Sequence, residues 1–599
     1  MNKSERFVFD RLPQDFCERI EHGKFNRTLY PVSTDRKAWK NAANTPVAAR
    51  IIASADKVLE GELPQLLFSN YCQYPLNGNR SEYETPYFQR RREMAFLALA
   101  LCLTGDREKY LSRLLDYVVA ILEEGTWCLP AHARWGKNNI DRWRFCDLFA
   151  AETGAVMSLL YQILGDELES VVPGIKAVIR KKTLDQTVNT ICDRNIEHWW
   201  ENSNNPQNWT VWCSSNAILT SLVLVDNCSK LVSLLRRFLA HTSRFINHFA
   251  DDGYCPEGPS YYMKANLMVF QTLLLLEKAL PGCAEKLFGE PKLKVMMEFI
   301  VNARITDTYA VSFGDSKPQF NPCPALIIPA GKAFKSQRLA AFENVKEYPL
   351  GACGDHLASL LAMLFDMPTE NVEKNPEDNP LTIFKDRLAI LRSQEFSLSL
   401  KAGNNDEPHN HNDLGNFELF YGTDPVIVDA GTGTYSKEHF SDQRYNIWHI
   451  RGTGHNAPVF GDFEQIAGRE YTSAFTLTDG KLLTCDLSGA YPEEAQVKSA
   501  RRIIHYQQDK VVVEDFFELA EPCKTSITLL TVKKHEIISE SLIRLGEVTL
   551  QLEDAVFEES KEMPVLEQNN INIWNAQLTA LKLTTTGNHI KMTFLPTEK

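Results

Sequence analysis

The hydrophobic pattern of the chain changes near residue 385, and no single fold class accommodates both parts. Before this point apolar side chains recur at three- and four-residue steps, for example over residues 231–245, which is typical of helices with one buried face. After it, short β-branched and aromatic runs alternate with polar residues and turns, as over residues 417–428, which predicts antiparallel hairpins. We therefore predict a helical domain over residues 1–385 and an antiparallel β domain over residues 386–599.

The length and charge of the chain exclude some classes of protein. The 599 residues carry a formal net charge of −13, so we expect no nucleic-acid partner, because such a protein needs a basic face to neutralise phosphates. An acidic glycan is still compatible, since local basic clusters such as residues 90–92 matter more than the total charge. The longest apolar run, residues 94–103, is too short to cross a bilayer. We expect no membrane association, and the oligomeric state stays open.

The N-terminal sequence MNKSERFVFDRL lacks the apolar core of a signal peptide. The 14 cysteines are scattered and form no CxxC pair, which fits reduced, buried thiols. We therefore expect a cytoplasmic protein for the chain as it stands, or a periplasmic or secreted one if a leader preceded it.

The densest group of chemically active residues lies in the sequence PHNHNDLGNF, which contains His409, His411 and Asp413. Asp429 follows at the end of the predicted return strand, and His455 comes further on. Two imidazoles and a carboxylate from separate strands suit zinc, so one histidine of this sequence, Asp429 and His455 form a candidate zinc site. The alternative is a hydrogen-bonded polar cluster at a sheet edge.

Two segments of the helical part carry further polar candidates. The sequence NNPQNW, residues 204–209, leads into an apolar helix. Its asparagines are helix caps or amides that hydrogen-bond a substrate carboxylate with help from neighbouring backbone N–H groups. The sequence DDGYCPEGPSYY, residues 251–262, joins two helices and by itself predicts a rigid loop with packed aromatic rings.

Together these segments resemble the heparinase II/III-like polysaccharide lyases. The sequence WCLPAH at residues 127–132 and the spacing of Asp429, Gly431 and Tyr435 are also similar to motifs of that family. The resemblance implies an incomplete α/α toroid followed by a large antiparallel β-sandwich. It also implies an enzyme that cleaves glycans by β-elimination next to a uronic acid.

Carried over residue by residue, the resemblance implies a role for each motif. Asn208 would neutralise the substrate carboxylate, with Asn205 as the alternative. Tyr262 would be the catalytic tyrosine, with Tyr261 as the alternative, and His409 the catalytic histidine. Whether the tyrosine or the histidine removes the C5 proton depends on the uronate epimer and stays open here. His411, Asp429 and His455 would hold a structural zinc ion. Further contacts to substrate would come from Arg134, Trp209 and Glu257.

The implied substrate is an acidic oligo- or polysaccharide: heparin or heparan sulfate, hyaluronan, chondroitin or alginate. The missing leader favours imported oligosaccharides and exo-action. One alternative is a glycoside hydrolase on an α/α toroid, which needs two carboxylic acids at the bond; Glu257 and Asp252 could supply them. The other is a non-catalytic glycan-binding protein, although the Asn, Tyr and His candidates are all present.

Overall fold

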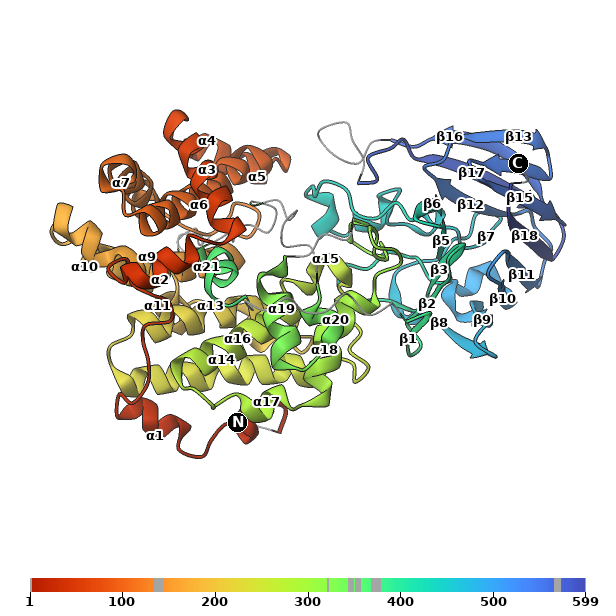
Figure 1. The fold of residues 1–599 in the computed structure, drawn as a ribbon. Helices are drawn as coiled ribbons and strands as arrows, with labels where there is room; N and C mark the ends of the chain where they lie inside the picture. The colour runs from red at the N-terminus through yellow and green to blue at the C-terminus, as the bar shows by residue number, and fades with distance from the viewer. Residues whose placement is uncertain are drawn as a thin grey trace. The chain divides into compact units, whose positions relative to one another are not determined.

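A computed structural model describes residues 3–133, 135, 144–319, 323–342, 350, 357–367, 379–564 and 573–597. The chain divides into two compact units (Figure 1). The first, the helical unit, comprises Met1–Asp251, Met263–Glu298 and Pro322–Pro376. The second, the β unit, comprises Asp252–Tyr262, Phe299–Asn321 and Glu377–Lys599.

The helices of the helical unit follow the predicted apolar periodicity. α14 (Cys228–His248) buries the face expected over residues 231–245, and Asn227 caps it by accepting a hydrogen bond from Lys230 N at 2.8 Å. α14 and α16 (Asn266–Ala279) both pack on α13 (Asn208–Leu224) (Figure 1). The other helices of this unit are α1 (Phe16–Glu21), α2 (Arg36–Ala42), α3 (Pro46–Glu60), α4 (Phe68–Tyr71), α5 (Gln73–Asn77), α6 (Ser81–Thr104), α7 (Arg107–Glu123), α9 (Leu148–Val171), α10 (Ile175–Gln186), α11 (Val188–Cys192), α12 (Trp199–Asn202), α17 (Glu285–Phe288), α18 (Pro291–Asn302, which runs into the β unit), α19 (Pro324–Ala333), α20 (Gln337–Ala340) and α21 (Leu357–Phe365).

Helix α9 is the central apolar helix of this unit. By length and composition it could cross a membrane, but 83% of its apolar window is buried inside the unit, as expected of a core helix. Asp147 caps its first turn through a 2.7 Å bond from Ala150 N to Oδ1. The second oxygen, Oδ2, contacts Leu129 N at 3.1 Å and His132 Nδ1 at 2.7 Å. The WCLPAH sequence is therefore anchored to the start of α9.

The β unit contains three open antiparallel sheets among the described residues. The five-stranded sheet has the order β1 (Leu381–Phe384), β2 (Leu388–Arg392), β3 (Phe396–Lys401), β5 (Phe417–Tyr421), β6 (Asp424–Ile427). The nine-stranded sheet has the order β13 (His535–Ser539), β14 (Leu542–Leu545), β15 (Val548–Glu553), β18 (His589–Pro596), β11 (Val511–Leu519), β10 (Val497–Tyr506), β9 (Leu482–Asp486), β8 (Gly468–Thr478), β4 (Gly403–Asn405). The four-stranded sheet has the order β16 (Val556–Glu562), β17 (Thr579–Thr585), β12 (Thr525–Thr531), β7 (Val459–Phe460). All three contribute side chains to one buried apolar core.

The hairpin expected over residues 417–428 is confirmed. β5 pairs with β6, and β10 pairs with β11 across the turn at residues 507–510. The fold class, helices followed by antiparallel strands, is confirmed as well.

A buried ion pair fixes the loops beside the β5–β6 hairpin. Arg502 on β10 is fully buried and donates 2.7 Å hydrogen bonds to both oxygens of Asp515. Its remaining N–H groups bond Gly415 O at 2.7 Å and Asn456 Oδ1 at 2.9 Å. Because every contact is charge-assisted and shielded from water, this guanidinium holds the start of β5 and the segment after His455 in a fixed geometry.

The β unit begins earlier in the chain than the sequence pattern indicated. β1 starts at Leu381, and the segments Asp252–Tyr262 and Phe299–Asn321 pack with the strands although they lie between helices. Their aromatic residues explain this placement: the ring of Tyr254 lies 6.0 Å from Phe313 and 5.7 Å from Phe384. A division at a single residue therefore misses two loops that belong to the second unit.

We predict that Glu418 makes stability pH-dependent. Glu418 is 3% exposed and accepts hydrogen bonds from Ser312 Oγ and Ser399 Oγ. Burial and the negative charge of Asp429 raise the pKa of Glu418, whereas the hydrogen bonds from the two serines lower it. The raising effects are larger, and the pKa is about 7. In the unfolded chain Glu418 loses its proton near the ordinary pKa of about 4.3, whereas in the folded state it keeps the proton up to about pH 7. Stability therefore falls as the pH rises between these two pKa values.

The Glu418→Gln variant cannot ionise at this position, so its stability should not fall with pH for this reason. Melting temperatures of both proteins between about pH 5 and pH 8 check the prediction: the wild type should lose stability relative to the variant as the pH rises. Parallel curves over this range would contradict it.

Candidate active site and metal centre

Three segments of the β unit, one short helix and two loops, converge on the side chain of Asp315. They are α15 (Gly258–Tyr262), residues 312–316, and residues 406–411, which precede β5. Two glycines allow the close approach. A Cβ on Gly258 (φ +78°) would lie 2.1 Å from Ser316 Oγ, and one on Gly314 (φ +60°) would lie 2.9 Å from His409 O. Both positions also require a left-handed backbone, which glycine adopts without steric cost.

The two tyrosines of α15 point in different directions. Tyr261 stacks on His409 with ring centroids 3.9 Å apart and an interplanar angle of 22°. Tyr262 is fully buried, and its ring lies 6.2 Å from that of Phe299. Consecutive helical residues are about 100° apart around the axis, so only one tyrosine can face the histidine. Tyr261, the alternative, therefore faces His409, and Tyr262 does not.

His409 is held in an unusual backbone conformation. Its φ is +60°, which costs a non-glycine residue about 1 kcal/mol or more and persists where the surroundings enforce it, often at functional sites. Its Nδ1 lies 2.8 Å from Asp315 Oδ2, and its Nε2 lies 3.7 Å from Glu257 Oε2. The backbone at His409 is therefore not extended, yet the rings of His409 and His411 reach the same carboxylate.

Asp315 is the residue that sequence reasoning missed. It is 2% exposed, and its Oδ1 lies 3.0 Å from His411 Nε2. Arg444 Nη2 lies 3.1 Å from each of its oxygens. Burial alone would raise its pKa, but the bonds to His409 and His411 and the Arg444 charge outweigh burial and hold the pKa well below its usual range. The one local signal is the Gly314-Asp315 turn, which is too common to identify a site.

A second tyrosine joins this group from the segment after β6. Tyr435, the last residue of the Asp-x-Gly-x-x-x-Tyr spacing, places its hydroxyl 2.5 Å from the hydroxyl of Tyr261 and 3.5 Å from His409 Nδ1. Burial raises the pKa of both tyrosines, and the nearby Asp315 charge adds to the effect. Both phenols therefore stay protonated at neutral pH.

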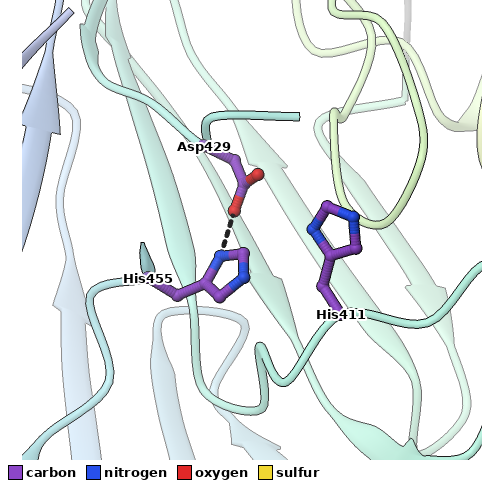
Figure 2. A group of neighbouring side chains, drawn as sticks. All are labelled: His411, Asp429 and His455. Atoms are coloured by element: carbon purple, nitrogen blue, oxygen red, sulfur yellow. Dashed lines mark hydrogen bonds and ion pairs between the residues drawn. The ribbon is translucent and has the colours of Figure 1, made fainter. Parts of the chain in front are cut away.

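The candidate metal ligands lie together, as Figure 2 shows. His411, Asp429 and His455 are all buried, and each offers a ligand atom within 4.8 Å of the others. They come from loops rather than from strands: His411 precedes β5, Asp429 follows β6, and His455 precedes β7. The sequence therefore identified the group correctly but not the elements that carry it.

The chemistry of these three side chains fits a zinc ion. His411 Nδ1 and His455 Nε2 are buried, and neither has a hydrogen-bond partner within the described part of the chain. His455 Nδ1 lies 2.7 Å from Asp429 Oδ2. Burial opposes both charges, but the mutual attraction of the pair lowers the pKa of Asp429 and raises that of His455. Zinc binds the unprotonated nitrogen of an imidazole and the oxygen of an ionised carboxylate. His411 Nδ1, His455 Nε2 and the Asp429 carboxylate can supply these ligand atoms.

The helical unit contributes a separate polar group at the start of α13. Asn208 is the first residue of this helix and 2% exposed; Gln207, not Asn208, occupies the N-cap position. Trp209 stacks edge-on against His132 at 4.8 Å and contacts Trp199 at 5.1 Å. Asn205 lies outside the helix, in a turn with Ser203. Arg134 lies outside the described residues.

The two carboxylates that a hydrolase would need have different environments. Asp252 accepts backbone hydrogen bonds on both oxygens, from Tyr254 N at 3.1 Å and Lys385 N at 2.8 Å. It therefore stabilises a turn, whereas Glu257 lies beside His409. Since Asp252 is occupied in this way, the geometry does not support the hydrolase alternative.

Comparison with known proteins agrees with this architecture. Residues 387–578 match the sequence family described as Heparinase II/III-like, C-terminal. No curated protein matches the chain in sequence. The predicted resemblance to the heparinase II/III-like family is confirmed over this region.

Solved structures extend the similarity of fold to most of the chain. A heparinase III structure superimposes with a TM-score of 0.57 at 13% identity and covers 86% of this chain and 78% of its own. The heparan sulfate lyase HepC from Pedobacter heparinus superimposes with a TM-score of 0.54 at 11% identity and covers 95% of this chain and 87% of its own. The chondroitin AC lyase of Streptomyces coelicolor A3 superimposes with a TM-score of 0.52 at 11% identity and covers 94% of this chain and 82% of its own. At these identities the likeness establishes the fold.

We predict that the purified protein carries about one zinc ion per chain. His411→Ala should remove a ligand, so both the metal and part of the thermal stability should be lost. His409→Ala is the matched control: its Nδ1 is directed at Asp315, so this variant should keep the metal. Elemental analysis and melting curves of the three proteins check this. A metal-free wild type would return the cluster to a hydrogen-bonded polar group. Zinc lost from His409→Ala but retained by His411→Ala would exchange the roles of the two histidines.

Proposed function

We propose that the protein is a polysaccharide lyase that cleaves a uronic-acid-containing glycan by β-elimination. The observation that carries the proposal is the pairing of His409 and Tyr261: the imidazole, bonded to Asp315, stacks directly on the phenol. Structures of the same fold include a heparan sulfate lyase and a chondroitin AC lyase. A base and an acid held together are what this elimination needs.

The reaction removes the proton on C5 of the uronate and breaks the bond between C4 and the glycosidic oxygen. The electron pair of the C5–H bond becomes the C4–C5 double bond, and the departing oxygen takes a proton. Negative charge builds up on the uronate carboxylate along the way, so hydrogen-bond donors aimed at that group lower the barrier.

His409 is the proposed base. An ionised carboxylate can only accept hydrogen bonds, so the 2.8 Å contact between Asp315 and His409 Nδ1 requires the ring to carry its proton there. The lone pair then lies on Nε2, the nitrogen near Glu257. A neutral imidazole with a free Nε2 can accept the C5 proton.

Tyr261 is the proposed acid. Because burial keeps its pKa above the ordinary value, the phenol holds its proton at neutral pH and can donate it to the departing oxygen. Tyr435 contacts the same hydroxyl at 2.5 Å, so a proton lost from Tyr261 can be replaced along this bond.

The helical unit supplies the proposed carboxylate contact. Asn208 sits in the first turn of α13, where the helix dipole favours an anion. Its amide would add a donor to the developing charge, and Trp209 would offer an apolar face to a sugar ring. Glu257, beside His409, would contact sugar hydroxyls.

Zinc at His411, Asp429 and His455 would act structurally. It would hold the loops that precede β5, follow β6 and precede β7, and it would supply no group to the bond that breaks. His411 is the member of this set that shares Asp315 with His409.

The substrate class is tested with a panel of heparan sulfate, hyaluronan, chondroitin and alginate. A lyase leaves an unsaturated uronate that absorbs ultraviolet light, whereas a hydrolase does not. We expect absorbance to grow on at least one uronate glycan; product sizing then tests exo-action, which would release short products from the start. Cleavage without absorbance would identify a hydrolase, and binding without cleavage would identify a glycan-binding protein.

We predict that Tyr261→Phe lowers kcat by about 10²–10⁴-fold, as expected when a general acid is removed, with substrate binding retained. Tyr262→Phe is the matched control, since it makes the same change one residue away and on a side chain packed in the interior. It should keep turnover. Steady-state kinetics with the best substrate of the panel measures both. Full activity of Tyr261→Phe with loss in Tyr262→Phe would reverse the assignment.

A further inference from the structure

The carboxylate of Asp315 contacts two histidines that have different proposed roles. Its Oδ2 lies 2.8 Å from Nδ1 of His409, and its Oδ1 lies 3.0 Å from Nε2 of His411. All three side chains belong to the β unit. The two bonds use opposite ring nitrogens, so they have opposite consequences for the two rings.

Asp315 is ionised in this environment because a guanidinium faces both of its oxygens. Arg444 Nη2 lies 3.1 Å from Oδ1 and from Oδ2. An ionised carboxylate has no proton to donate, so each neutral histidine must direct an N–H toward it. His409 then carries its proton on Nδ1 and its lone pair on Nε2, while His411 carries its proton on Nε2 and its lone pair on Nδ1.

These two lone pairs are the ones that the site uses. Nε2 of His409 is the nitrogen near Glu257, at 3.7 Å. Nδ1 of His411 is buried without a hydrogen-bond partner among the described residues, and it faces Asp429 and His455 in Figure 2.

We propose that Asp315 is a positioning residue that sets the tautomers of His409 and His411 together and so couples the metal centre to the base. The inference rests on the proposed function for the role of His409, but the tautomers themselves do not depend on any substrate. Arg444 strengthens the arrangement, because it also donates to Asn410 O at 2.9 Å, the carbonyl between the two histidines. The guanidinium of Arg444 therefore holds both the carboxylate of Asp315 and the loop that carries the two histidines.

The wild-type protein tests the inference directly. Nitrogen chemical shifts of ¹⁵N-histidine-labelled protein distinguish the two tautomers, and peaks can be assigned by their loss in His409→Gln and His411→Gln. We expect the Nδ1–H form for His409 and the Nε2–H form for His411. The opposite tautomer in either ring would overturn the proposal, whatever the catalytic activity of the protein.

Asp315→Asn supplies the functional test. An amide has one accepting oxygen and must donate its N–H to the other ring, so one histidine must exchange tautomers and lose its working lone pair. Loss of such outer partners costs about 10–100-fold in metal affinity or activity. We expect kcat at saturating zinc, zinc affinity, or both to fall by this factor, with KM unchanged.

Glu418→Gln is the matched control, because it also converts a buried carboxylate of the β unit to an amide but bonds serines rather than histidines. It should keep both zinc affinity and kcat. Wild-type zinc affinity and kcat in Asp315→Asn would overturn the proposal. Predicted tautomers and weakened zinc binding in a protein inactive on every uronate glycan would support it while refuting the proposed lyase function.

Discussion

The carboxylate of Asp315 lies between two imidazoles and a guanidinium, and the site of the β unit is organised around it. A buried carboxylate is unfavourable unless its charge is compensated and its lone pairs are used. Here both oxygens accept from a histidine and from Arg444. This compensation holds the two rings in a fixed orientation, and removal of any partner would leave charge or polar atoms unsatisfied inside the unit.

The rest of the β unit gives this hub a rigid frame. Gly258 and Gly314 let α15 and the loop at residues 312–316 approach closely, while Arg502, paired with Asp515, fixes the start of β5 and the segment after His455. Catalytic groups placed on loops need such support, because a displacement of about 1 Å is enough to cost much of the rate. The positive φ of His409 is maintained by these contacts.

Local sequence patterns predicted much of the fold and the three residues of the candidate metal site. Helical periodicity located α14, and alternation with turn residues located the β5–β6 hairpin. His411 and Asp429 flank the β5–β6 hairpin, so their proximity follows from short-range topology, whereas His455 comes from the segment before β7. The choice between Tyr261 and Tyr262 depended on the rotational phase of a five-residue helix, which the sequence does not specify. Asp315 lies 94 positions from His409, and only the packing of two separate loops brings them together.

The central claim, that the His409–Tyr261 pair acts on a uronate, is tested most directly by a crystal structure of the Tyr261→Phe protein with a uronate oligosaccharide from its best substrate class. The account predicts the uronate C5 within reach of His409 Nε2, the scissile oxygen beside ring 261, and a metal ion at His411, Asp429 and His455. A glycan bound away from His409, or a glycosidic bond held between two carboxylates, would contradict it.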